Sequence, residues 1–236
     1  MSEIKALLFD VFGTVVDWRT SLIDNFTAWG QAKGLKGDWT ALVDGWRAAY
    51  MPSMDEVRKH PERGFVILDD LQRQSIEPLA AKLGITGLTS ADFDYLTRGW
   101  HSLNPWPDSV GGLTRLKRKF IISPLSNGNV ALLTNMAKHA GLPWDLVLSA
   151  EVFGHYKPDR EAYLGAAKIL GLTPGEVMLV AAHNNDLEAA QSFGLKTAFV
   201  PRPTEYGPHQ SRDFRPEGSW DYVVKDFNDL ADKLGC

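Results

Sequence analysis

Polar residues that can act as nucleophiles, bases or anion ligands follow three short apolar runs of this sequence. These residues are Asp10, Thr14, Ser126, Asn127, His183 and Asp186, and Lys157 lies just ahead of a further helical segment. In an open α/β sheet, ligands bind beyond the carboxyl ends of the strands. If the apolar runs are strands of such a sheet, carboxylates, hydroxyls, amides and a lysine converge at one edge, where they could perform nucleophilic or acid–base chemistry.

The apolar runs have the length and composition of buried parallel strands. They cover residues 4–9, 120–125, 177–181 and 197–200. Pro124 weakens its run as an interior strand, because proline cannot donate a hydrogen bond to a neighbouring strand. Between the later runs lie helical segments that each end at a glycine, at 131–139, 160–170 and 186–193. This alternation predicts an α/β fold with a doubly wound parallel sheet.

Residues 16–100 contain no convincing buried strand, and their apolar residues recur at helical spacing. The segment from Met51 to Glu62 carries two prolines and many charges, which predicts a loop within this helical region. We therefore expect two domains. Residues 1–15 and 101–236 form an α/β core, and residues 16–100 form a helical cap inserted after the first strand.

The composition is that of an ordinary globular enzyme. The 236 residues carry a formal net charge of -4, which gives no electrostatic footprint for nucleic acid. No apolar run reaches the roughly 18–20 residues of a membrane span. Asp10 interrupts the first apolar run, which argues against a signal peptide, and the single cysteine, Cys236, cannot form an internal disulfide. These features predict a cytoplasmic protein that contacts neither membrane nor nucleic acid.

Four segments resemble the motifs of the haloacid dehalogenase superfamily. They are residues 9–14 (Phe-Asp-Val-Phe-Gly-Thr), 125–128 (Leu-Ser-Asn-Gly), 156–159 (Tyr-Lys-Pro-Asp) and the segment that ends at Asp186. The resemblance covers the whole chain and implies a Rossmann-like core with an inserted helical cap. Most members of the superfamily are phosphatases, so the reaction has to be inferred from individual positions.

Two positions favour dehalogenation over phosphate hydrolysis. Phosphatases of the superfamily carry a second Asp that protonates the leaving alkoxide, where this sequence has Phe12. They also carry an acidic residue that helps to hold Mg²⁺, where this sequence has Ala182. A halide leaves as a stable anion, and a carboxylate can attack a monoanionic haloacid without a metal. We therefore expect a hydrolase without metal or cofactor that converts short-chain 2-haloacids to 2-hydroxy acids and releases a halide.

The resemblance is to the type II (S)-2-haloacid dehalogenases, and it implies the (S) enantiomer, inversion at C2 and a homodimer. Asp10 would attack C2 and form an ester, while Lys157 would keep Asp10 ionised. Asp186, with Thr14 and Lys157, would position or activate the water that cleaves the ester. His183 departs from the family pattern, and it could position this water or shape the wall of the pocket.

The resemblance also implies the residues that bind the substrate. Its carboxylate would be held by Ser126, Lys157 and the backbone N–H groups of Val11 and Phe12. Arg47 would receive the departing halide with help from Asn127. Tyr163 matches a functional tyrosine of the family.

Several of these residues also have a purely structural interpretation. Asp10 and Asp186 could cap a turn and a helix, Ser126 and Asn127 could serve turn geometry alone, and Arg47 could pack on a helix face. Two other functions stay open. One is a phosphatase or phosphonatase with an atypical metal site, and the other is a binding module without catalysis. The sequence leaves the preferred halogen open, fluoride included.

Overall fold

The computed structural model describes residues 3–236 and is built around a six-stranded parallel sheet. The strands are β1 (Ala6–Phe9), β4 (Ile121–Ser126), β5 (Leu148–Ser149), β6 (Val177–Ala181), β7 (Lys196–Phe199) and β8 (Tyr222–Val223). Their order in the sheet is β5-β4-β1-β6-β7-β8. The predicted doubly wound sheet is confirmed, and the structure adds the short edge strands β5 and β8, which the sequence did not indicate.

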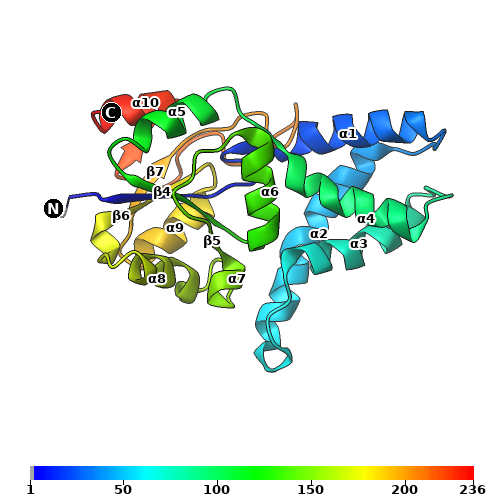
Figure 1. The fold of residues 1–236 in the computed structure, drawn as a ribbon, viewed down its shortest axis with the longest axis horizontal. Coiled ribbons are helices and arrows are strands. Elements are labelled where there is room, and N and C mark those ends of the chain that lie inside the picture. The colour runs from blue at the N-terminus through cyan, green and yellow to red at the C-terminus, as the bar shows by residue number, and fades with distance from the viewer. Residues whose placement is uncertain (1–2) are drawn as a thin grey trace.

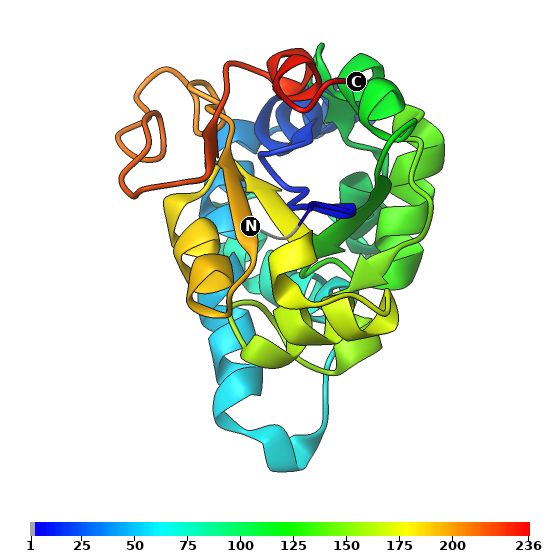
Figure 2. The ribbon, with the colours of Figure 1, turned by 90° about the vertical axis from the view of Figure 1, so that its left-hand side faces the viewer.

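Successive residues of the central strand β1 face two different helical layers. Leu7 and Phe9 join a buried cluster with residues of α5 (Ser109–Leu116), α6 (Val130–Ala140) and α10 (Phe227–Lys233). Ala6 and Leu8 join a second cluster with residues of α8 (Arg160–Ile169) and α9 (Asn184–Ser192). The short helix α7 (Ala150–Phe153) precedes α8. This alternation explains why the strand is apolar throughout, since both of its faces are covered (Figure 2).

Four helices form a separate unit beside the sheet (Figure 1). They are α1 (Trp18–Ala32), α2 (Trp39–Lys59), α3 (Leu68–Lys82) and α4 (Ser90–Arg98). The chain enters and leaves this unit through β2 (Val16–Asp17) and β3 (Asn104–Pro105), which pair antiparallel. Three short 3₁₀ turns complete the elements: η1 (Pro61–Arg63), η2 (Gly99–Ser102) and η3 (Pro174–Glu176). Within residues 3–236, none of the helices is long and apolar enough to cross a membrane.

The loop predicted from Met51 to Glu62 is wrong, because α2 continues through Pro52 as far as Lys59. Proline inside a helix costs about 3 kcal/mol through its missing N–H and its ring. Tyr50 and Met54 lie on one face of α2 and are both buried, so the helix loses packed surface if it ends at the proline. Tertiary packing therefore outweighs the local signal.

Strand β4 likewise continues through Pro124, which lies opposite Phe9 of β1. The pairing of β4 with β5 involves Leu125 and Ser126, beyond the proline. The strand can therefore accommodate a residue without an N–H, because its pairing with β5 is limited to two residues, which local sequence does not reveal.

Candidate active site

The polar residues singled out in the sequence meet where β1, β4 and β6 end. These three strands are neighbours in the sheet, so the residues that follow them come together. Asp10 follows β1, Asn127 follows β4 and His183 follows β6, while Lys157 reaches the same edge from the turn before α8. All four line one cavity of about 480 Å³. Helices α2, α8 and α9 and the loop after β7 also contribute to its walls.

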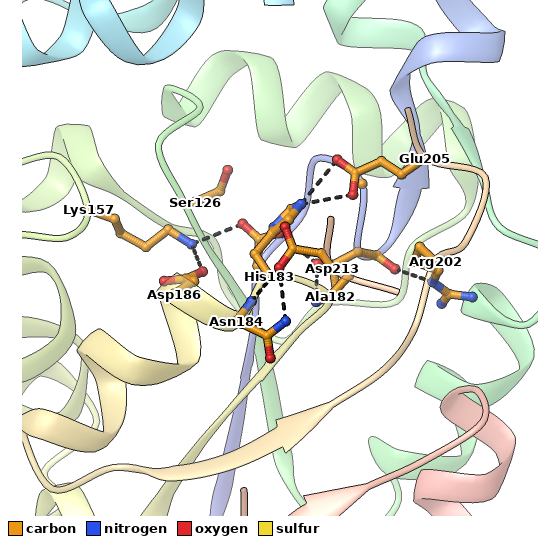
Figure 3. Close-up of polar contacts among 12 residues, drawn as sticks. Ser126, Lys157, Ala182, His183, Asn184, Asp186, Arg202, Glu205 and Asp213 are labelled. Carbon is orange, nitrogen blue, oxygen red and sulfur yellow. Dashed lines mark hydrogen bonds and ion pairs between the residues drawn. The ribbon is translucent and has the colours of Figure 1, made fainter. Parts of the chain in front are cut away.

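Lys157 lies between two carboxylates in this cavity. Its Nζ is 3.0 Å from Oδ1 of Asp10 and 2.5 Å from Oδ2 of Asp186, and all three residues are buried (Figure 3). Burial alone would raise the pKa of Asp10, but Lys157, His183 and Thr14 together hold it well below its ordinary value. Burial would lower the pKa of Lys157, but the two carboxylates hold it above its ordinary value. Asp10 is therefore an ionised carboxylate shielded from water.

Asp186 serves as an anchor for the lysine. Its Oδ2 accepts a hydrogen bond from the ammonium of Lys157, and its Oδ1 accepts a hydrogen bond of 2.6 Å from the hydroxyl of Tyr163. Burial and the adjacent Asp186 raise the pKa of Tyr163, so its hydroxyl stays protonated and donates. His183 occupies the N-cap position of α9, and Asp186 lies within the first turn. Both Asp186 oxygens are thus engaged with side chains rather than with the end of the helix.

Thr14 fixes the second carboxylate oxygen of Asp10. Its hydroxyl donates to Oδ2 of Asp10 at 2.7 Å and accepts from the backbone N–H of Ala182 at 2.9 Å. The carbonyl of Thr14 accepts a hydrogen bond of 2.9 Å from Nε of Arg202, whose other nitrogens form a bidentate ion pair with Asp108. The loop that carries Asp10 is therefore held at both its side chain and its backbone.

His183 bridges Asp10 and a second buried carboxylate, Glu205 (Figure 3). Its Nδ1 is 3.1 Å from Oδ2 of Asp10, and its Nε2 is 2.9 Å from Oε2 of Glu205. Burial would lower the pKa of His183, but Glu205 and Asp10 raise it well above its ordinary value of 6.5. Burial would raise the pKa of Glu205, but His183, Arg47 and Trp18 lower it. The pair is thus an imidazolium and a carboxylate in the resting site.

Glu205 was missed in the sequence because it lies in an irregular loop without a motif. The sequence feature that relates to Glu205 is Gly13, whose φ is +91°. A Cβ atom at Gly13 would lie 2.1 Å from Oε1 of Glu205, so the glycine is required both by its backbone conformation and by the carboxylate beside it. The same loop contributes Tyr206, Arg212 and Asp213 to the cavity, which were also missed.

Helix α2 places Arg47 and Tyr50 in the wall of the cavity. The guanidinium carbon of Arg47 is 4.3 Å from the ring centre of Tyr50 and 5.4 Å from that of Trp18. Among the described residues, the buried Nε and Nη1 atoms of Arg47 have no hydrogen-bond acceptor. A buried guanidinium without an acceptor is suited to bind an anion. Tyr50 was not among the residues expected at the site.

The remaining predicted residues lie close to Asp10 in different ways. Phe12 and Asn127 line the cavity, whereas Val11 and Ser126 are buried next to these two residues along the chain. Oδ1 of Asn127 accepts the backbone N–H of Lys157 at 2.7 Å, and Oγ of Ser126 accepts the N–H of Gly128 at 3.2 Å. Within residues 3–236, the N–H groups of Val11 and Phe12 donate to no backbone carbonyl. The backbone after Asp10 therefore offers free donors.

The donor set does not fit a divalent ion between the two carboxylates. The ammonium of Lys157 already bridges Asp10 and Asp186, and Tyr163 donates to the remaining Asp186 oxygen. Ala182 offers only its backbone, and its N–H is directed to Thr14. In the described part of the chain, no group of three or more His, Cys, Asp or Glu side chains is arranged to hold a metal ion. Hard cations such as Mg²⁺ need converging oxygen ligands instead.

Known proteins resemble this chain over most of its length. A model of the haloacid dehalogenase-like hydrolases matches residues 4–194. The (S)-2-haloacid dehalogenase of Xanthobacter autotrophicus is 31% identical over 207 residues, which cover 84% of this chain and 76% of that protein. The crystal structure of the defluorinating L-2-haloacid dehalogenase Rha0230 matches with a TM-score of 0.95 and 51% identity, over 99% of this chain and 96% of that one. The L-2-haloacid dehalogenase PA0810 matches with a TM-score of 0.95 and 50% identity, over 98% and 99% of the two chains.

Replacement of Lys157 by methionine tests whether the lysine neutralises this site. Without the cation, Asp10 and Asp186 cannot both stay ionised in a buried site, so one carboxylate takes up a proton and its pKa rises above the ordinary 3.8. The folded variant then binds more protons than the unfolded chain. As the pH falls from about 8 to about 5, the free energy of unfolding of the variant should therefore rise relative to that of wild type. In wild type the pKa of Asp10 is lowered, so the contribution of Asp10 to the free energy of unfolding is already complete above pH 3.8.

Thermal denaturation of both proteins at the two pH values measures this difference. Lys117→Met is the matched control, because Lys117 pairs with Asp145 at the surface, and it should follow the wild-type pH profile. A Lys157→Met variant that also followed the wild-type profile would contradict the assignment.

Proposed function

Because this chain belongs to the haloacid dehalogenase-like hydrolases, we propose that it hydrolyses the carbon–halide bond of short-chain (S)-2-haloacids. The products are a 2-hydroxy acid and a halide ion. The observation that carries this proposal is the buried ion pair of Asp10 and Lys157, in a site where Phe12 and Ala182 replace the acids of a phosphatase. The relatives named above, (S)- or L-2-haloacid dehalogenases, support it.

In the first step, Asp10 displaces the halide. A carboxylate oxygen attacks C2 opposite the carbon–halogen bond, an oxygen–carbon bond forms, and the electron pair of the broken bond leaves with the halide. Oδ2 accepts hydrogen bonds from Thr14 and His183, whereas among the described side chains Oδ1 has Lys157 as its donor. We assign the attack to Oδ1, which retains more free lone-pair density. Attack from the far side inverts C2.

The substrate carboxylate is bound beside the nucleophile. The free N–H groups of Val11 and Phe12 and the ammonium of Lys157 are the donors that the geometry offers, and Ser126 supports the turn next to them. The halide leaves toward Arg47, whose unpaired Nε and Nη1 atoms gain an acceptor as the charge develops. Asn127 faces the same cavity and assists.

In the second step, water cleaves the ester, and His183 is the group that accepts its proton. Ester formation removes the charge of Asp10, which is one of the causes that raise the pKa of His183. The pKa of the imidazole therefore falls at this stage, and it can release its proton and act as a base. Glu205 orients the ring through Nε2. Water attacks the carbonyl carbon of Asp10 as His183 accepts its proton, and the imidazolium returns this proton to the C2 oxygen as the carbon–oxygen bond breaks and the hydroxy acid leaves. The carboxyl proton of Asp10 then passes to His183, so the proton that His183 released after ester formation is the one lost to solvent.

Asp186 has a different role in this scheme from the one expected at first. Both of its oxygens are engaged, with Lys157 and with Tyr163, so it holds the lysine rather than activating water. Thr14 in turn orients Asp10. For a phosphatase reaction, the same site lacks a side-chain acid at positions 12 and 182, and a phosphate dianion would lie beside the Asp10 carboxylate without a divalent ion between them.

Several broader features complete the proposal. Residues 16–100 act as a cap domain that closes over the core formed by residues 1–15 and 101–236, since α2 supplies cavity residues. Fluoride is among the leaving groups, a proposal supported by the name of the defluorinating relative Rha0230. The family resemblance supports a homodimer, and the single cysteine suits the cytoplasm.

Release of chloride from (S)-2-chloropropionate tests the proposed reaction. We expect release to continue unchanged in EDTA and to fall about a thousandfold or more in Asp10→Asn, because the amide cannot form the ester. Asp44→Asn, which alters an exposed ion pair with Arg19, serves as the control and should match wild type. Chelator-sensitive hydrolysis of a phosphate ester without chloride release would instead favour a phosphatase.

Pre-steady-state halide release tests the role of His183. In His183→Gln the first step should remain, while ester cleavage should slow by about a hundredfold because the base is lost. A burst of one halide per active site followed by slow turnover is the expected trace, and Glu205→Gln should show a weaker form of it. His139→Gln, at an exposed histidine bonded to Asn104, is the control. Unchanged turnover without a burst would rule out this role.

A further inference from the structure

Tyr50 lies beside Arg47, the group assigned above to receive the departing halide. It follows Arg47 by three residues on α2, so both side chains project from one face of the helix. The Arg47 guanidinium lies over the Tyr50 ring, with 4.3 Å between its central carbon and the ring centre. Both side chains line the cavity together with Asp10 and Asn127.

The ring of Tyr50 is fixed in place. The residue is 8% exposed, and its ring meets that of Phe12 edge-on, at 6.1 Å between centres and an interplanar angle of 78°. Arg47 covers one face of the ring. Edge-to-face and cation–π contacts of this kind hold an aromatic side chain in a defined orientation. The position of the hydroxyl is therefore set before any ligand arrives.

The hydroxyl of Tyr50 retains a hydrogen that it can donate. Asn127 lines the same cavity. Its Oδ1 already accepts the backbone N–H of Lys157 at 2.7 Å, so the amide is oriented to offer its Nδ2 donor to other groups of the cavity. The phenolic hydrogen is therefore left for a ligand in the cavity. Burial raises the pKa of Tyr50, so this hydrogen stays in place.

We propose that the Tyr50 hydroxyl binds the departing halide together with Arg47 and Asn127, and that it determines which halogens the enzyme can remove. This inference rests on the proposed function. The carbon–halogen electron pair moves onto the halide, and Tyr50 donates a hydrogen bond without losing its proton. A hydrogen bond to an acceptor with a full negative charge is about twice as strong as one between neutral groups. Hydroxyl donors make shorter hydrogen bonds to anions than N–H donors do.

The contribution of this donor depends on the leaving group. Fluoride is the smallest halide and concentrates its charge most, so its departure depends most on a close donor in place of water. Bromide is large and leaves readily, and it can rely on Arg47. Loss of the Tyr50 hydroxyl should therefore affect the halogens to different extents. A packing defect would lower the rate with every substrate alike, because Asp10 attacks all of them.

Tyr50→Phe tests this inference with fluoroacetate, chloroacetate and bromoacetate. Phenylalanine keeps the ring beside Arg47 and Phe12 and removes only the oxygen. We expect kcat for fluoride release to fall about a hundredfold, as for other lost transition-state donors. We expect kcat for bromide release to change less than about threefold, with chloride between them and KM little changed. Tyr95→Phe, which removes a surface hydroxyl bonded to Asn25 at 2.9 Å, is the matched control and should leave all three rates unchanged.

Equal fold-losses for the three haloacetates would overturn the inference, and so would unchanged rates for all three. Wild-type enzyme that releases bromide but no fluoride would also overturn it, while leaving the proposed function intact. Wild-type enzyme that releases none of the three halides would show that the proposed function itself has failed.

Discussion

The contact of one ammonium group with two buried carboxylates is the interaction on which the site depends. Lys157 lies between Asp10 and Asp186, and a carboxylate deprived of its cation in such surroundings would bind a proton and lose its nucleophilic character. His183 with Glu205 and the guanidinium of Arg47 add two cations and one carboxylate to the charges around Asp10. These opposite charges let an anionic substrate enter and an anionic product form beside a buried carboxylate.

The surrounding fold keeps these charges at fixed distances. β1, β4 and β6 are adjacent in the sheet, and Asp10, Asn127 and His183 follow their ends within two residues, so all three lie at one edge. The ion pair of Arg202 and Asp108 supports the carbonyl of Thr14, and Thr14 in turn supports Asp10. Asp10 is thus held in place, and the substrate is oriented against it. This suits a displacement in which the carboxylate oxygen must approach C2 in line with the carbon–halogen bond.

The sequence predicted those parts of the molecule that depend on local pattern. The apolar runs predicted the four longer strands. Asp10 and its neighbours could be predicted as site residues because they follow these strands, and the carboxyl ends of parallel strands meet at one edge of a sheet. Glu205 could not be predicted, since it reaches His183 from an irregular loop whose path depends on tertiary contacts. Tyr50 was overlooked because a loop was expected from Met51 onward. The helix continues because Tyr50 and Met54 are buried on the same face of α2, and this packing is visible only in the structure. The two-residue strands β5 and β8 are too short for a periodic signal.

The identity of the oxygen atoms after one turnover tests most directly whether Asp10 forms a covalent ester. Excess enzyme is allowed to react once with (S)-2-chloropropionate in ¹⁸O water, and the peptide that contains Asp10 is then analysed by mass spectrometry. Water that cleaves the ester at its carbonyl carbon leaves its oxygen on the enzyme, so the account predicts ¹⁸O in the Asp10 side chain and none in the first equivalent of hydroxy acid. Label confined to the hydroxy acid would mean that water attacks C2 directly, and would contradict the account.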